Sequence, residues 1–254
     1  MLYVNFCFTG TNEMTLKTYI PNPFNPRVVG TPGSARVDLL QSVTGVILGL
    51  FLLVHLHFES SILLGKEAFF HTVQFLEGSM FSSTQYGWHW VTRTISIFML
   101  VVFIIHAVTA LRRFPAKLGE WRALRHFQHT VKHSDTTIWF WQLLTGCALF
   151  FLVPVHLFQM IQDPSIGPNM SPARVYLDNV WVLYSIFLPI VIIHAVFGLY
   201  RVSIKWGIIN QRTALRKFAF FLVAYLFVLG LASLFTYIYL GSQLVLPVTP
   251  YIPQ

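Results

Sequence analysis

Five long apolar segments constrain this chain more than any other feature of its sequence. A bilayer core of about 30 Å needs about 20 residues of α-helix to cross it, and each segment is long enough. Hydrophobic residues make up 55% of the 254 residues and charged residues only 10%, which is typical of integral membrane proteins. We therefore predict an all-α bundle of five transmembrane helices at 38–241, between an N-terminal arm at 1–37 and a tail at 242–254. The expected spans are 39–64, 88–111, 137–161, 179–206 and 215–240.

The connections between these spans differ sharply in positive charge. The loop at 112–135 holds six Lys or Arg residues and the region at 201–217 holds five, whereas the loops at 58–87 and 158–178 hold only Lys66 and Arg174. Positive residues stay on the cytoplasmic side, so the N-terminus is expected in the cytoplasm and the C-terminus outside the inner (cytoplasmic) membrane. The net charge of +8 arises largely from these loops. It predicts a membrane lipid surface, and not nucleic acid, as the partner.

Two histidine-containing patterns are each written twice. The segment 192–201 repeats 104–113 and places His194 where the earlier copy has His106. A second pattern places a Gln fourteen residues before a His in both copies, at Gln41 and His55 and again at Gln142 and His156. An imidazole inside an apolar span needs a partner, because an unpaired polar group is costly there.

The depths of the four histidines follow from the alternating direction of the spans and a rise of about 1.5 Å per residue. His55 and His156 fall toward the outside, His106 and His194 fall toward the cytoplasm, and the two levels lie about 13 Å apart. Each level thus has one imidazole from each of two helices. Two six-coordinate b-type haems, stacked one above the other, need that arrangement of ligands.

Other residues are placed to serve the same cofactors. Thr44 and Thr145 each lie eleven residues before a histidine and are followed by glycine, so these small pairs face the other level, where a macrocycle needs room. Cations and hydrogen-bonding groups at the cytoplasmic edge are candidates to contact haem propionates. They are Arg113, Arg201, Lys205, Gln41, Ser42 and Trp139.

Simpler interpretations stay open for each feature. One intramembrane histidine is more often a packed residue than a ligand, and the four gain their weight from the duplication and the matched depths. The Thr-Gly pairs can equally serve helix packing without a cofactor. The three cations can act as interface anchors.

The membrane part, about residues 36–217, resembles the di-haem cytochrome b subunits of succinate:quinone oxidoreductases, in particular the single large anchor of quinol:fumarate reductases. The resemblance covers Gln41-Ser42, Thr44-Gly45, His55, Ser61-Ile62-Leu63-Leu64-Gly65, His106, Phe114-Pro115, His133-Ser134-Asp135-Thr136-Thr137, Trp139, Gln142, Thr145-Gly146, His156, His194, Gly198-Leu199-Tyr200-Arg201 and Lys205-Trp206-Gly207. It implies the pairing of His106 with His194 and of His55 with His156 that the depths indicate.

The resemblance also implies a function and partners. Menaquinol would be oxidised near the outer haem, and electrons would pass through both haems to an iron-sulfur subunit and an FAD-containing flavoprotein that reduces fumarate to succinate. Counted without gaps from Gly65, Glu77 matches the family's quinol-site glutamate, and its simpler interpretation is a solvated loop carboxylate. Weaker proton-accepting candidates are Glu59, His89 and Arg93. The chain departs from some members at Ile192, where they carry a glutamate used for proton movement.

Several alternatives remain at this stage. The same assembly can run in reverse as a succinate:menaquinone reductase, and its physiological direction and oligomeric state, a dimer of heterotrimers among others, are open. A cytochrome b anchor of a hydrogenase or formate dehydrogenase would normally dock its partners outside, whereas the basic loops here face inward. A transporter that relays protons through histidines would hold no haem, and a purely structural anchor would leave Glu77 and the outer histidines unexplained.

Overall fold

The computed structural model describes residues 32–82, 87–112, 114–115, 117–131 and 134–253. Most of the N-terminal arm predicted at 1–37 lies outside the described residues, as does Arg113. The chain separates into two units, residues 1–39 and 40–254, and the arrangement given below is that of the second unit.

Every regular element in the described ranges is helical. The longer helices are α1 (Pro32–Glu59), α3 (His89–Leu111), α5 (Ser134–Gln162), α7 (Trp181–Lys205) and α8 (Arg212–Ser242). The shorter ones are η1 (Ser60–Leu64), α2 (Lys66–Leu76), η2 (Ser79–Phe81), α4 (Leu118–Val131) and α6 (Met170–Tyr176). Five of these helical segments are long and apolar enough to cross a membrane, which confirms the predicted fold class. α5 and α8 each begin three residues before the predicted span, because a helix can continue for a polar turn beyond its apolar part.

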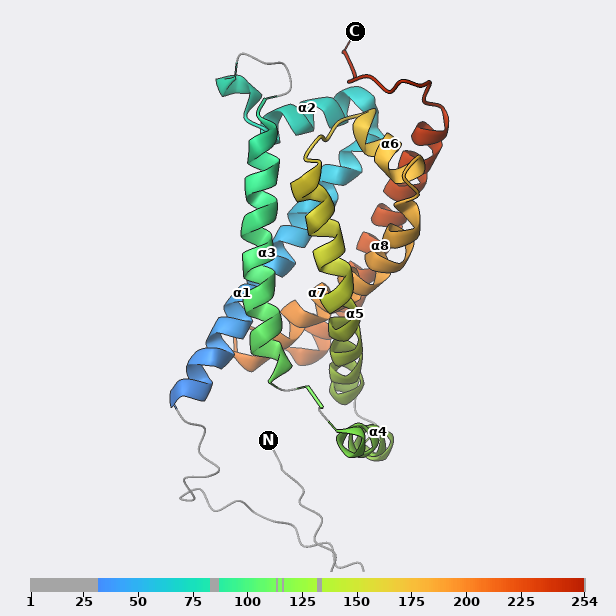
Figure 1. The fold of residues 1–254 in the computed structure, drawn as a ribbon. Coiled ribbons are helices and arrows are strands. Elements are labelled where there is room, and N and C mark those ends of the chain that lie inside the picture. Colours follow the sequence, from blue (N-terminus) through green and yellow to red (C-terminus); the bar gives the residue numbers. More distant parts are fainter. Residues whose placement is uncertain (1–31, 83–86, 113, 116, 132–133, 254) are drawn as a thin grey trace, which may run out of the picture. The chain divides into compact units, whose positions relative to one another are not determined.

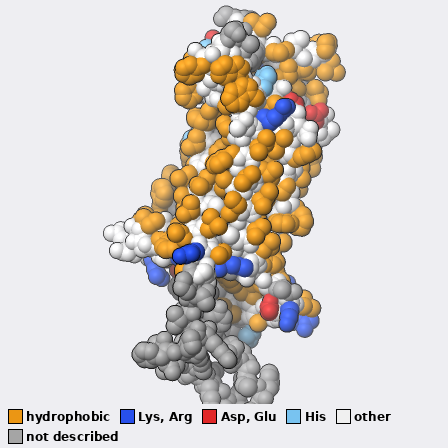
Figure 2. Space-filling view, turned by 60° about the vertical axis from the view of Figure 1, so that its left-hand side comes forward, with side chains coloured by type: hydrophobic (Ala, Val, Ile, Leu, Met, Phe, Trp, Pro, Cys, Tyr) orange, Lys and Arg blue, Asp and Glu red, His pale blue; other side chains and the backbone are white. Residues whose placement is uncertain are grey.

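The spanning helices pack in a simple order. α5 packs against both α3 and α7, and α8 packs against α7 (Figure 1). α2 and α6 lie at one end of the bundle and α4 lies at the other. Figure 2 shows hydrophobic side chains covering the side of the bundle, while most of the Lys and Arg side chains visible on that face gather near one end. An apolar flank with charged ends is the surface that a membrane-spanning bundle requires.

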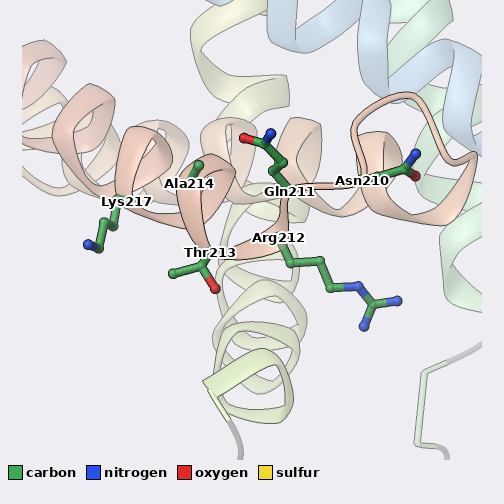
Figure 3. A pocket seen from close by; sticks show the side chains of 6 residues that line it. All are labelled: Asn210, Gln211, Arg212, Thr213, Ala214 and Lys217. Carbon is green, nitrogen blue, oxygen red and sulfur yellow. The ribbon is translucent and has the colours of Figure 1, made fainter.

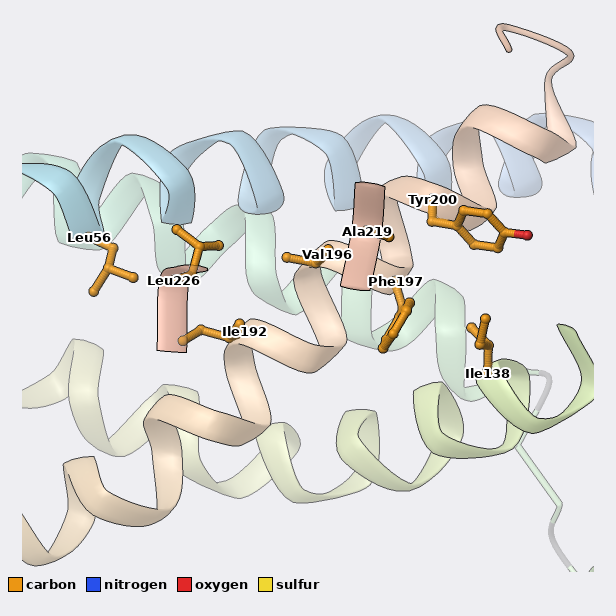
Figure 4. Packing of buried hydrophobic residues seen from close by; sticks show 8 residues of the cluster. All are labelled: Leu56, Ile138, Ile192, Val196, Phe197, Tyr200, Ala219 and Leu226. Atoms are coloured by element: carbon orange, nitrogen blue, oxygen red, sulfur yellow. The ribbon is translucent and has the colours of Figure 1, made fainter. Parts of the chain in front are cut away.

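Two apolar clusters hold the bundle together. The first lies in the middle and joins α1, α5, α7 and α8 (Figure 4). Its buried members are Leu56, Ile138, Ile192, Val196, Phe197, Tyr200, Ala219 and Leu226. The second joins η1, α2, α6 and α8 at the end opposite α4, and it consists of Ile62, Phe69, Val73, Val175, Leu234 and Tyr237. The first cluster fixes α7 against its neighbours, and the second fixes the short helices over the end of the bundle.

Candidate functional site

The structure brings the four intramembrane histidines together as two facing pairs. His106 on α3 faces His194 on α7, with ring centroids 6.5 Å apart and ring planes at 87°. His55 on α1 faces His156 on α5, with centroids 6.3 Å apart and planes at 50°. Each pair joins two helices, and every one of the four ligand candidates comes from a different helix. We call His106 with His194 the inner pair and His55 with His156 the outer pair, after the sides of the membrane that the sequence predicts.

The spacing of each pair fits a metal held between two imidazoles. Metal–imidazole bonds are about 2 Å long, and with roughly 1 Å from each nitrogen to its ring centre, a shared metal separates the centroids by about 6 Å. No group of three or more His, Cys, Asp or Glu side chains gathers anywhere in the described residues. Two protein ligands are the number that a six-coordinate haem iron takes, because the macrocycle supplies the other four.

The inner histidines are held by the two duplicated threonines. Thr44 Oγ1 donates to the Leu40 carbonyl at 2.8 Å, and Thr145 Oγ1 donates to the Trp141 carbonyl at 2.7 Å. Because each hydroxyl already donates its proton to a carbonyl, it can only accept a hydrogen bond from the nearby histidine. The hydroxyl of Thr44 lies 3.3 Å from Nδ1 of His106, and that of Thr145 lies 3.1 Å from Nδ1 of His194. A proton on Nδ1 leaves the Nε2 lone pair available for a metal. Such partners fix both the tautomer and the orientation of a ligand.

The glycine that follows each threonine leaves room for the same ring. A Cβ atom at Gly45 would lie 2.9 Å from Cε1 of His106, and one at Gly146 would lie 3.0 Å from Cε1 of His194. We expected these small pairs to make room for a macrocycle at the other level. The structure shows that these pairs instead make room for the histidine ring itself. In each pair the threonine accepts a hydrogen bond from the ring, and the glycine leaves space for it.

Two buried amide oxygens at matching places of the duplicated pattern have no partner. They are Oε1 of Gln41 and Oε1 of Gln142. The other polar groups of these residues serve the inner histidines, because the Gln41 carbonyl accepts from Nδ1 of His106 at 3.2 Å and Gln142 Nε2 donates to the His194 carbonyl at 3.0 Å. Buried polar atoms are nearly always satisfied. The two oxygens therefore favour a site completed by a bound group.

The remaining candidates for propionate contacts are only partly assembled. Lys205 Nζ lies 3.5 Å from Oγ of the buried Ser42, which links α7 to α1 at the inner end. Trp139 and Arg201 are half-buried on α5 and α7. Ile192, two residues before His194, is fully buried in the central apolar cluster. Position 192 therefore has no carboxylate that could carry a proton beside His194.

Glu77 is not a solvated loop residue, because its side chain is only 1% exposed. α2 ends at Leu76, and Gly78 follows in the left-handed conformation with φ of 66°, so the chain turns directly after the carboxylate. The Trp88 amide donates to the Glu77 carbonyl at 3.0 Å, and a side chain at Gly87 would collide with that carbonyl. The start of α3 is thereby tied to the end of α2.

The Glu77 carboxylate faces two side chains of α3. Thr92 Oγ1 donates to Oε1 at 2.8 Å, and His89 Nδ1 lies 3.2 Å from Oε2. Burial raises the pKa of Glu77, and the Thr92 hydroxyl and His89 oppose that rise. His89 is itself 51% exposed, so it connects the buried carboxylate to the surface. The arrangement suits a group that accepts a proton and passes it outward.

Two of the three weaker candidates from the sequence have contacts away from Glu77. Arg93 Nε donates to the Ile161 carbonyl at 3.0 Å and thereby joins α3 to α5. Glu59 accepts from the Tyr237 hydroxyl on α8 at 3.0 Å. Sequence reasoning missed Tyr184, whose hydroxyl lies 3.3 Å from Nδ1 of His156. Tyr184 lies ten residues before His194 on the same span, which is about 15 Å along the helix at about 1.5 Å per residue. This separation could have placed Tyr184 near the level of His55 and His156.

An open hollow lined mainly by residues with polar or charged side chains lies at the turn between α7 and α8 (Figure 3). It is lined by Asn210, Gln211, Arg212, Thr213, Ala214 and Lys217. None of the four histidines borders it, so it is separate from the histidine pairs.

Comparisons with known proteins find the following similarities. The family described as succinate dehydrogenase/fumarate reductase transmembrane subunit matches residues 119–233. A fumarate reductase cytochrome b subunit of Helicobacter pylori is 39% identical over 212 residues, which cover 82% of each chain. The fumarate reductase cytochrome b subunit of Wolinella succinogenes is 34% identical over 240 residues, which cover 92% of each chain.

Proposed function

Because this chain belongs to the family of fumarate reductase cytochrome b subunits and is a multi-pass membrane protein, we propose that it oxidises menaquinol and passes the electrons through two b haems. The electrons leave to iron-sulfur and flavoprotein subunits that reduce fumarate to succinate. The observation that carries the proposal is the pair of facing histidine couples, at 6.5 Å and 6.3 Å, on four different helices.

The residues of this chain have distinct roles in that proposal. His106 and His194 would hold the inner haem, and His55 and His156 the outer one, each through Nε2. Bound haem supplies one-electron transfer. Thr44 and Thr145 keep the inner imidazoles in the metal-binding tautomer. Gln41 and Gln142 offer their unpartnered oxygens beside the inner site.

Glu77 is proposed to accept a proton from the quinol hydroxyl. Oxidation of one quinol releases two electrons and two protons, and the carboxylate must be ionised to take one of those protons. Burial raises the pKa of Glu77, so this pKa lies closer to neutral pH than the pKa of an exposed glutamate. The carboxylate therefore binds a proton more readily than an exposed glutamate does. His89, hydrogen-bonded to Glu77 and half-exposed, then passes the proton to water.

The soluble partners are proposed to dock on the cytoplasmic side, where the FAD and the iron-sulfur clusters would lie. The basic connections at 112–135 and 201–217 favour that side of the inner membrane for both loops and place the C-terminus outside. The hollow at the α7–α8 turn, with Arg212 and Lys217, lies in one of these connections and offers a polar contact surface to the iron-sulfur subunit (Figure 3).

Haem counting tests the proposal directly. Purified protein should give a dithionite-reduced minus oxidised spectrum of b haem, and pyridine-haem analysis should count two haems per chain. His106→Ala or His194→Ala should remove the inner haem alone, and His55→Ala or His156→Ala the outer haem alone. His57→Ala is the matched control. His57 lies two residues from His55, but its side chain is exposed on the surface of the bundle and is within hydrogen-bond distance of the Tyr225 hydroxyl, at 2.9 Å. Folded wild-type protein without haem would overturn the proposal.

A further inference from the structure

The segment that follows α8 returns across the end of the bundle where α2 and α6 lie. α8 ends at Ser242, and residues 243–253, here called the tail segment, cross that end (Figure 1). The side chains near the start of the tail segment are exposed, with Val245 84% and Leu246 70% accessible. Residues near its far end instead contact the short helices. This segment has no part in the proposed function so far.

Two contacts fasten the tail segment to the short helices. Asn169 Nδ2, just before α6, donates to the Thr249 carbonyl at 3.0 Å. The ring of Tyr251 meets the ring of Phe70 of α2 edge-on, with centroids 5.9 Å apart and planes at 63°. Phe70 is fully buried, so the tail segment helps to cover it. Asn169 also accepts a hydrogen bond at 2.9 Å from Nζ of Lys66, the first residue of α2. The tail segment is therefore linked to both the start and the middle of α2.

α2 leads directly into Glu77. The helix has eleven residues, Lys66–Leu76, and a helix of that length is marginal without tertiary contacts. It packs through Phe69 and Val73 into the second apolar cluster, while Phe70 lies against the tail segment. The Glu77 amide donates to the Val73 carbonyl at 2.9 Å, so Glu77 continues the hydrogen-bond pattern of the helix. A displacement of α2 would therefore move Glu77 as well.

We propose that the tail segment is a positioning element for the quinol site, because it holds α2 so that the Glu77 carboxylate stays buried against α3. The inference rests on the role of Glu77 in the proposed function. Within the described residues, the polar groups that face this carboxylate are Thr92 and His89, both on α3. Tyr251 and Asn169 are then positioning residues, since they act on Glu77 through α2.

The pH dependence of quinol oxidation reports this positioning. Burial is the largest cause acting on the pKa of Glu77 and raises it, while the Thr92 hydroxyl and His89 oppose that rise. A looser α2 admits water to the carboxylate, so this pKa should fall toward that of an exposed glutamate. Because only the ionised carboxylate accepts a proton, the rise of the rate with pH should then move to lower pH. A contact that served stability alone would not move this profile.

The test compares the intact purified assembly with two variants, a chain that ends at Ser242 and Tyr251→Ala. A soluble naphthoquinol serves as electron donor and fumarate as acceptor. In both variants the pH–rate profile should shift to lower pH by about 0.5–1 unit. The kcat should fall about 10- to 100-fold, because a displacement of about 1 Å costs about 10²-fold. Both haems should stay bound with unchanged potentials, and amide hydrogen exchange in α2 should become faster.

Two controls separate positioning from a general loss of stability. Val245→Ala changes an exposed side chain of the same segment and should behave like the wild type. Tyr251→Phe keeps the ring that packs on Phe70 and should restore most of the wild-type profile. The inference is wrong if Tyr251→Ala and the shortened chain keep the wild-type profile, or if their rates fall without a shift of the profile. Absence of haem from the wild-type protein, or full turnover by Glu77→Gln, would instead refute the proposed function.

Discussion

Replacing Gly45 by alanine should selectively damage the inner haem site. A Cβ atom there would lie 2.9 Å from Cε1 of His106, whereas ordinary van der Waals contact begins near 3.4 Å. The ring must therefore retreat by about 0.5 Å, which exceeds the tolerance of about 0.2 Å for a metal–ligand distance. The ring has little freedom to do so, because Thr44 and the Gln41 carbonyl hold its Nδ1.

Gly49→Ala is the control for steric crowding on the same helix. A Cβ at Gly49 would lie 3.0 Å from Cγ of Leu199, which is an aliphatic side chain and not a ligand candidate. We expect Gly49→Ala to lower the free energy of unfolding by about 1–3 kcal/mol, because the added methyl group overpacks the helix contact, while both haems stay bound. Gly45→Ala should lose the inner haem or change its low-temperature α-band and its potential, and should leave the outer haem unchanged. An unaltered inner haem in Gly45→Ala protein would refute the assignment of this glycine to ligand clearance.

Three other changes have expected outcomes. Thr145→Val removes the acceptor at Nδ1 of His194 and should weaken retention of the inner haem about tenfold, measured by haem transfer to an apo-acceptor protein. Glu77→Gln should keep both haems and lower the rate of menaquinol oxidation by about 10²–10⁴-fold, so full turnover would exclude Glu77 as the proton acceptor. The wild-type rate should rise as pH rises through the raised pKa of Glu77, because only the ionised carboxylate accepts a proton. Thr92→Val removes a contact that lowers this pKa, so the pH–rate profile should move to higher pH, and an unmoved profile would contradict the role of Thr92.

The sequence was sufficient to predict the spans and which histidines lie near each other. Both follow from regularities along one helix, namely the length of an apolar run and the rise per residue. The small pair Thr44-Gly45 was placed at the right level by the same reasoning. Its actual neighbour, the ring of His106, depended on which helix lies opposite, and helical periodicity does not fix that.

The contacts of Glu77 and Tyr184 were beyond sequence reasoning for a different reason. Glu77 is buried because the turn at Gly78 and the start of α3 place Thr92 and His89 against it, across fifteen and twelve residues of chain. The partners of a loop residue depend on tertiary packing of the short helices over the end of the bundle. Tyr184 lies on a span that is apolar on all sides, so no amphipathic face distinguished it from its neighbours.

α1 and α5 each belong to both histidine sites. α1 carries His55 for the outer pair and Thr44-Gly45 for the inner pair, and α5 carries His156 and Thr145-Gly146 in the same way. A haem bound at one level would therefore order a helix that the other level needs, and the coupling free energy must be the same in either order of binding. If both haems bind, the loss of one would then lower the affinity for the other without removing it.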